Sequence, residues 1–114
     1  MTLEEFFTQL KTRPESIEFQ QTMQVIEDNY RYTPTDFING DTVNESGANE
    51  GSCKIFAFGK LNDLTEQETL ACFGVYYRED VLQHPDATDH ANIRNFILHG
   101  LSGVKFDTPA LELS

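Results

Sequence analysis

The chain has 114 residues, the length of a single domain over 1–114, and can bury a core without disulfides or metals. Nineteen Asp and Glu against eight Lys and Arg give a formal net charge of −11, which argues against binding to nucleic acid or anionic membranes. No stretch reaches the ~18 apolar residues of a membrane span, and the acidic start lacks the features of a secretory signal. Two cysteines fit a reducing compartment, so we expect the protein in the cytoplasm of the cell that makes it. We also expect a monomer.

The first thirty residues predict two helices. Thr2 and Glu5 form a capping box, and the apolar residues that follow recur at the i, i+3, i+4 and i+7 spacing of one helical face. The Arg13-Pro14 step ends this helix, and proline suits the first turn of a second helix, which we expect over residues 15–29.

A small antiparallel sheet is predicted next. Asn39-Gly40 lies between the short apolar runs 37–38 and 42–43, which is typical of a hairpin with a type I′ turn. The alternating segment 104–106 could add a third strand to this hairpin.

Three further helices are expected in the rest of the chain. Ser52 caps one over residues 53–61, and a capping box at Thr65 opens a long one that ends at His84-Pro85. Thr88 or Asp89 caps the last, which runs through residue 99 and stops at Gly100. The expected inward residues of these helices are Ile55, Phe56 and Phe58, then Leu70, Phe73, Tyr77, Val81 and Leu82, then Ile93, Phe96 and Ile97. The fold class is therefore mostly helical α+β, with about five helices packed on a hairpin or three-stranded sheet.

One catalytic hypothesis starts from Cys53, which falls in the first turn of a predicted helix. The free N–H groups and helix dipole there lower the pKa of a thiol, and His90, oriented by Asp80 or another polar neighbour, could act as its base. The alternative is a small buried cysteine at a helix start, since free cysteine is among the most buried residue types. Cys72, on an apolar helix face, is expected to fill the core.

Other kinds of site find less support. A phosphate-binding loop has four residues between its two glycines and a lysine directly after the second glycine. The Gly47–Lys54 stretch has three residues between its glycines, and two residues separate the second glycine from the lysine, so it lacks this spacing. No paired Cys or His spacing predicts a metal site. We expect no metal and no cofactor.

A group of polar residues around the last helix allows two interpretations. Asn44, Asn49, His90 and Asn95 could anchor the neighbouring loops through hydrogen bonds, because loop backbone groups need partners. The same residues could instead line a ligand-binding or catalytic pocket.

Four long motifs resemble the HopJ type III effector family. They are N-Y-x-Y-T-P-T-x-F-x-N-G at 29–40, N-E-x-G-x-N-x-G-S-C-K-I-F-A-F at 44–58, L-A-C-F-G-x-Y-Y-R-E-D-V-L-x-H-P at 70–85 and T-D-H-x-N-I-R-N-F at 88–96. The resemblance implies a bacterial protein that type III secretion delivers into a host cell, and it assigns no catalytic residue. The candidate binding residues within or beside these motifs are Asn44, Asn49, Ser52, Lys54, Arg78, Asn92 and Arg94.

Three functional hypotheses follow. The first is a non-enzymatic protein-binding effector, whose acidic surface would favour a basic protein partner. The second is a small hydrolase or transferase that uses Cys53 and His90. The third is a bacterial housekeeping factor that stays in the cytoplasm.

Overall fold

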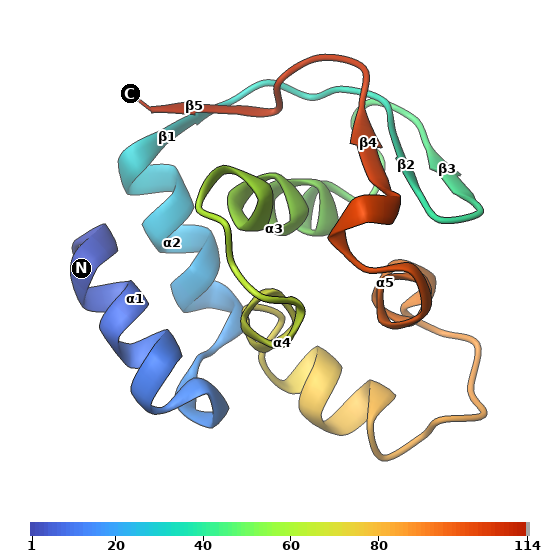
Figure 1. Ribbon diagram of the computed structural model, residues 1–114, viewed down its shortest axis with the longest axis horizontal. Coiled ribbons are helices and arrows are strands. Elements are labelled where there is room, and N and C mark those ends of the chain that lie inside the picture. Colours follow the sequence, from blue (N-terminus) through green and yellow to red (C-terminus); the bar gives the residue numbers. More distant parts are fainter. Residues whose placement is uncertain (114) are drawn as a thin grey trace.

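The computed structural model describes residues 1–113, and helix α3 (Glu50–Leu61) lies at their centre (Figure 1). Its consecutive residues Ile55–Gly59 are all buried, as expected for a helix that is apolar on every side. The ring of Phe58 contacts Phe6 at 5.8 Å between centroids, and the ring of Phe56 stacks on Phe96 at 4.9 Å. Helix α3 therefore joins the N-terminal helices to the C-terminal half, and its three expected inward residues are confirmed.

The N-terminal helices pack along one flank of α3. Helix α1 (Leu3–Thr12) begins with the predicted capping box, in which the Thr2 hydroxyl accepts from the Glu5 N–H at 3.1 Å. The second predicted helix is divided into a 3₁₀ turn, η1 (Pro14–Ser16), and α2 (Phe19–Asn29). Ile17 between them is fully buried and has an extended backbone, which interrupts the helix.

The predicted hairpin and third strand are both confirmed. Strand β2 (Phe37–Asn39) pairs antiparallel with β3 (Thr42–Asn44) and with β4 (Val104–Phe106), in the order β3-β2-β4. The turn lies one residue later than expected, because Asn39 pairs with Thr42 and leaves Gly40 and Asp41 as the loop. Gly40 has φ +58° and Asp41 has no positive φ, which fits a type II′ turn and not the predicted type I′ turn.

A second, two-stranded sheet was not predicted. Strand β1 (Tyr30–Tyr32) pairs antiparallel with β5 (Leu111–Leu113), so two segments far apart in the sequence lie side by side (Figure 1). The three-residue strands are too short for their alternation of side chains to mark them in the sequence.

The predicted long helix over 65–84 is wrong. It is divided into α4 (Glu66–Ala71), which begins with the expected Thr65 capping box, and a π-helical segment, η2 (Tyr76–Val81). Gly74 separates them with φ +62°, and a Cβ atom at this position would lie 2.7 Å from the backbone nitrogen of Phe19. The break rotates the second half of the predicted helix, so Leu82 is 54% exposed and not inward as expected.

The last helix, α5 (Ala91–His99), begins after His90, so the predicted caps Thr88 and Asp89 are wrong. Gly100 ends it with φ +68°, as expected, before the 3₁₀ turn η3 (Leu101–Gly103). Ile93 and Phe96 are buried as predicted, whereas Ile97 is 47% exposed. Within residues 1–113, no helix is both long and apolar enough to cross a membrane.

Candidate functional site

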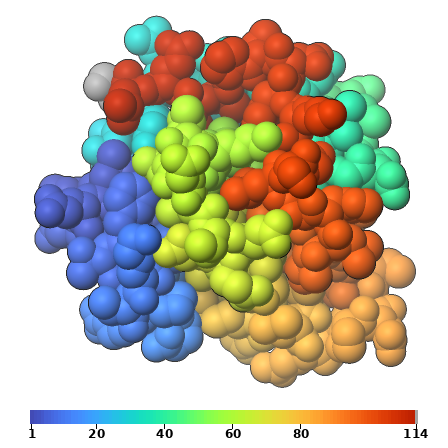
Figure 2. Space-filling view, viewed as in Figure 1, coloured from blue at the N-terminus to red at the C-terminus, as the bar shows by residue number. Residues whose placement is uncertain are grey.

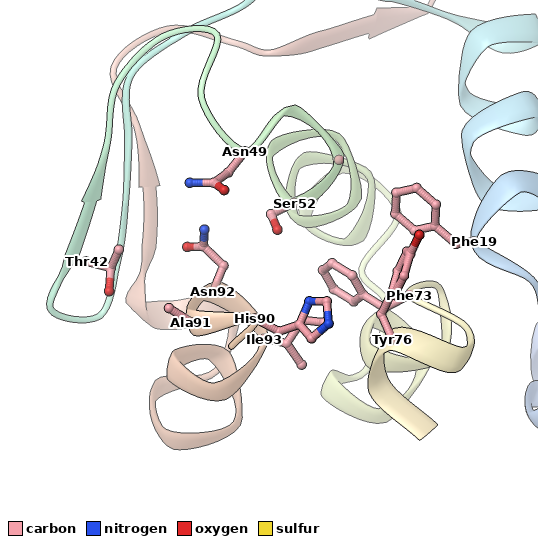
Figure 3. A pocket seen from close by; sticks show the side chains of 11 residues that line it. Phe19, Thr42, Asn49, Ser52, Phe73, Tyr76, His90, Ala91, Asn92 and Ile93 are labelled. Atoms are coloured by element: carbon pink, nitrogen blue, oxygen red, sulfur yellow. The ribbon is translucent and has the colours of Figure 1, made fainter. Parts of the chain in front are cut away.

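A pocket of about 390 Å³ lies where α3 and α5 begin (Figure 3). One wall consists of aromatic rings from α2 and from the segment after α4, and the other consists of the first turns of α3 and α5. The lining residues are Phe19, Thr42, Asn49, Gly51, Ser52, Phe73, Tyr76, His90, Ala91, Asn92 and Ile93. The pocket therefore combines stacking surfaces with hydrogen-bonding groups.

Both helices enter the pocket from a left-handed residue. Asn49 precedes α3 with φ 52°, and His90 precedes α5 with φ 51°. The first intrahelical bonds run from Cys53 N–H to the Asn49 carbonyl and from Arg94 N–H to the His90 carbonyl. The N–H groups of residues 50–52 and 91–93 precede these bonds and have no acceptor within their own helix. Partial positive charge from both helix starts therefore falls on one side of the pocket.

Ser52 does not cap α3 as predicted, because the helix starts at Glu50, three residues earlier than expected. The left-handed backbone of Asn49 sets this start in place of a side-chain cap. Ser52 is instead the third residue of the helix, and its half-buried side chain lines the pocket (Figure 3).

Four asparagines form a network behind the polar wall. Asn92 Oδ1 accepts from Asn39 Nδ2 and Asn44 Nδ2, each at 3.1 Å, and Asn92 Nδ2 donates to Asn44 Oδ1 at 2.9 Å. Asn49 Nδ2 donates to Asn44 Oδ1 at 2.7 Å. Exposed fractions of 0%, 2% and 6% show that Asn39, Asn44 and Asn92 are buried, whereas Asn49 is exposed at the edge of the network. It holds α5 against the hairpin and against the loop that leads into α3.

This network corresponds to the anchoring role expected for Asn44 and Asn49, with side-chain amides as partners in place of loop backbone. Asn95 likewise donates to the Thr42 hydroxyl of the hairpin. The sequence interpretation missed Asn39, which it assigned to the turn centre, although its side chain is fully buried.

His90 is held on the opposite side of the pocket from the hairpin. Its Nε2 lies 3.0 Å from Asp80 Oδ2, the orienting contact that the sequence suggested, and its ring centroid lies 5.3 Å from that of Tyr76. The imidazole turns toward Tyr76 and away from Asn49 (Figure 3). His90 therefore contacts η2 and does not anchor the loop before α3 as expected.

Cys53 lies outside this pocket. Its side chain is in the core, 1% exposed, and burial raises the pKa of its thiol, which is the opposite of what an activated nucleophile needs. The enclosed Tyr32 hydroxyl is its neighbour and has no hydrogen-bond partner within residues 1–113. No hydrogen bond joins Cys53 to His90 within residues 1–113. Cys72 fills the core as expected, and burial raises the pKa of its thiol to about 12.

The cationic candidates make internal contacts. Arg94 donates to the carbonyls of His84, at 2.9 Å, and Asp89, at 2.6 Å, and pairs with the Asp89 carboxylate at 2.7 Å. This bond holds the pKa of Asp89 below its usual value. Arg78 donates to the Ile17 carbonyl at 2.9 Å, and Lys54 Nζ lies 4.8 Å from the centre of the Tyr32 ring. These three residues organise the fold around the pocket and do not line it.

Of the candidate binding residues, the structure brings Asn49, Ser52 and Asn92 together in the pocket lining, with the catalytic candidate His90. It adds Phe19, Thr42 and Tyr76, which the sequence interpretation missed because these residues lie far apart along the chain. No group of three or more potential metal ligands occurs within residues 1–113.

A family model described as HopJ type III effector protein matches residues 3–111. The chain belongs to the HopJ type III effector family. A crystal structure described as that of the unknown-function protein VPA0580 has the same fold as this HopJ chain, with a TM-score of 0.98 and 56% sequence identity. The match covers 100% of this chain and 95% of that one. No curated protein matches the chain.

Proposed function

We propose that this HopJ-family chain is a non-enzymatic binding module that acts, as a type III effector, on a host protein with a basic surface. The distribution of charge is the observation that supports a basic partner. Every Asp and Glu within residues 1–113 is at least partly exposed, whereas Lys54, Arg78 and Arg94 are half-buried in internal contacts. The exterior is therefore strongly acidic, and such a surface attracts basic partners over a Debye length.

The pocket supports binding better than catalysis. It offers the Ser52 hydroxyl, the first-turn N–H groups and aromatic rings, all of which can hold a side chain of a partner. The thiol that a cysteine-dependent mechanism would require is buried, with a raised pKa. An enzymatic role through Cys53 and His90 is therefore the weaker proposal.

A translocation reporter fused to the full chain tests the effector role. We expect reporter signal in host cells exposed to a type III-competent bacterium and none with an isogenic strain that lacks the secretion ATPase. An established effector fused to the same reporter serves as the positive control. If the control is delivered and this chain is not, the effector role fails and the housekeeping alternative gains support.

Cross-linking of the purified chain in host extract tests the partner's chemistry. We expect the cross-linked proteins to be basic and to be lost when NaCl is raised to roughly 0.5 M, because screening then acts over only a few Å. Cross-linked partners that are acidic, or that resist salt, would contradict the charge argument while leaving delivery untouched.

A further inference from the structure

The pocket between the starts of α3 and α5 differs in charge from the rest of the molecule. The chain carries nineteen acidic and eight basic side chains, yet none of the residues within 1–113 that line this pocket is Asp, Glu, Lys or Arg. His90 is the lining residue that can become charged near neutral pH, and its Nε2 already lies 3.0 Å from the Asp80 carboxylate. The walls of the pocket therefore offer no free charged group to an ion.

Aromatic rings form one wall and are only partly covered by the fold. Tyr76 is 37% exposed and Phe19 is half-buried, and their rings meet edge to face at 5.0 Å between centroids. His90 adds a third planar group, whose ring is tilted by 36° to that of Tyr76. This wall (Figure 3) can pack against the ring of a planar ligand.

The other wall carries hydrogen-bond donors that the fold leaves unused. Within residues 1–113, the backbone N–H groups of 50–52 and 91–93 have no acceptor, and neither helix start has a side-chain cap. The Ser52 hydroxyl, half-buried in the lining, likewise has no hydrogen-bond partner in this part of the chain. Asn92 and Ile93 are only 6% and 3% exposed, and donors in such places need an acceptor. An acceptor atom of a bound molecule would satisfy them.

We propose that this pocket binds a small uncharged aromatic molecule that carries a carbonyl or another acceptor beside its ring. A cation would meet the partial positive charge of both helix starts. An anion would be repelled by the net charge of −11 and would find no Lys or Arg in the lining. An uncharged acceptor avoids both penalties, and about 390 Å³ lies in the range of small-molecule sites.

His90 adds a possible acceptor for such a ligand. When Nε2 of the neutral imidazole donates to Asp80, the lone pair lies on Nδ1, which has no partner within residues 1–113. A carboxamide, which has both a carbonyl and N–H groups, therefore suits the pocket. This inference goes beyond the proposed function, because the ligand needs no charge and is not the basic partner.

The probe is 2-naphthamide, which is planar and uncharged and has a carboxamide beside its rings. Titration of the full chain, followed by proton–nitrogen correlation NMR, gives both the affinity and the location. We expect a dissociation constant of about 1 mM or tighter, as for a ligand of this size, with the largest shifts at the N–H groups of residues 50–52 and 91–93. 2-Naphthoate and 2-naphthylmethylammonium have the same rings with opposite charges, and each should bind about tenfold more weakly. The fully saturated analogue of the probe should bind about fivefold more weakly, because it cannot stack.

Two variants with matched controls test the two walls. Tyr76→Leu removes the ring but keeps an apolar side chain, and Tyr77→Leu is its control, because Tyr77 lines a different hollow beside Leu10. Ser52→Ala removes the unpartnered hydroxyl, and its control is Ser102→Ala, in a hollow at the other end of α3. The segment where α3 ends reaches the surface seen in Figure 2, between the N-terminal helices and the C-terminal segment. We expect Tyr76→Leu and Ser52→Ala each to weaken binding of the probe by about fivefold and the controls to leave it unchanged.

The outcomes also separate this inference from the proposed function. Shifts confined to other residues, or no shift at all, would overturn the site, and this measurement uses the unaltered chain, so it does not depend on how the variants fold. Tighter binding of the naphthoate or of the ammonium compound would overturn the uncharged ligand. The affinity for 2-naphthamide should be unchanged in roughly 0.5 M NaCl, which removes a basic partner. Failure of either result therefore leaves the other standing.

Discussion

Replacement of Asn92 by alanine should destabilise the fold strongly, because this side chain joins α5 to the hairpin. The substitution removes the bonds to Asn92 Oδ1 from Asn39 and Asn44 and the bond from Asn92 Nδ2 to Asn44. The backbone carbonyl of residue 92 still accepts from Asn39 Nδ2 at 2.7 Å, and Asn44 Oδ1 still accepts from Asn49 Nδ2, so only the Asn44 Nδ2 group loses its partner. At about 1 kcal/mol for each of the three lost bonds, the free energy of unfolding should fall by about 3 kcal/mol.

The assay is thermal unfolding followed by circular dichroism, with urea titration for the free energy. For a domain of this size, 1 kcal/mol corresponds to about 4 °C, so we expect Asn92→Ala to lower Tm by about 12 °C. Asn95→Ala is the control on the same helix, since it loses a single bond to Thr42 and should cost about 1 kcal/mol. If Asn92→Ala lowers Tm no more than Asn95→Ala does, the buried network does not hold the pocket wall as argued.

Three further predictions concern the backbone, the thiols and pH. Gly74→Ala should lower the free energy of unfolding, measured by urea titration, by more than about 2 kcal/mol, because its Cβ would overlap the backbone at the start of α2. Gly47→Ala is the control: Gly47 also has a positive φ but lies in open space, so the loss should be about 1 kcal/mol. Cys53 and Cys72 should both react slowly with iodoacetamide near neutral pH, because burial raises the pKa of each thiol, and quickly once urea unfolds the chain. Mass spectrometry would measure the labelling. Rapid labelling of either thiol in the folded chain would contradict this. The Asp89 carboxyl has a lowered pKa in the folded state, so its contribution to stability is present above its unfolded pKa of about 3.9 and is lost as pH falls through the lower folded value. Asp89→Asn should therefore flatten the pH dependence of Tm below about pH 4. An unchanged slope would show that the ion pair between Asp89 and Arg94 does not contribute to stability.

Local signals in the sequence predicted the starts of elements well. The capping boxes at Thr2 and Thr65 each involve residues three apart, and both are present. The Asn39-Gly40 pair gave the hairpin correctly but not its register, because the buried side chain of Asn39 donates to Asn92 on α5, far along the chain. Gly74 ended a helix that its neighbours would otherwise have continued, and only the packing of α2 against this glycine shows why.

The candidate site was less predictable because it depends on which face of a helix meets which neighbour. Both helix starts were placed near Asn49 and His90 by the sequence, but the aromatic wall comes from Phe19 and Tyr76, which lie 57 positions apart and meet at 5.0 Å between ring centroids. A contact of this kind leaves no periodicity to detect. The family motifs include several of these residues without saying that they meet.

Ser52 and Cys53 show how one step along a helix decides the chemistry. Successive residues of an α-helix are rotated by about 100°, so Ser52 lines the pocket while Cys53 turns into the core. A thiol moved back by one position should therefore behave as the sequence first suggested for Cys53. In a Cys53→Ala background, Ser52→Cys would place a half-exposed thiol on the first turn of α3, where free N–H groups and the helix dipole stabilise a thiolate. We expect iodoacetamide near neutral pH to label it at least tenfold faster than it labels Cys53 in the unaltered chain, with the rate falling as pH drops below the thiol's lowered pKa. Equal, slow labelling of both proteins would show that the pocket does not expose the start of α3 to small molecules.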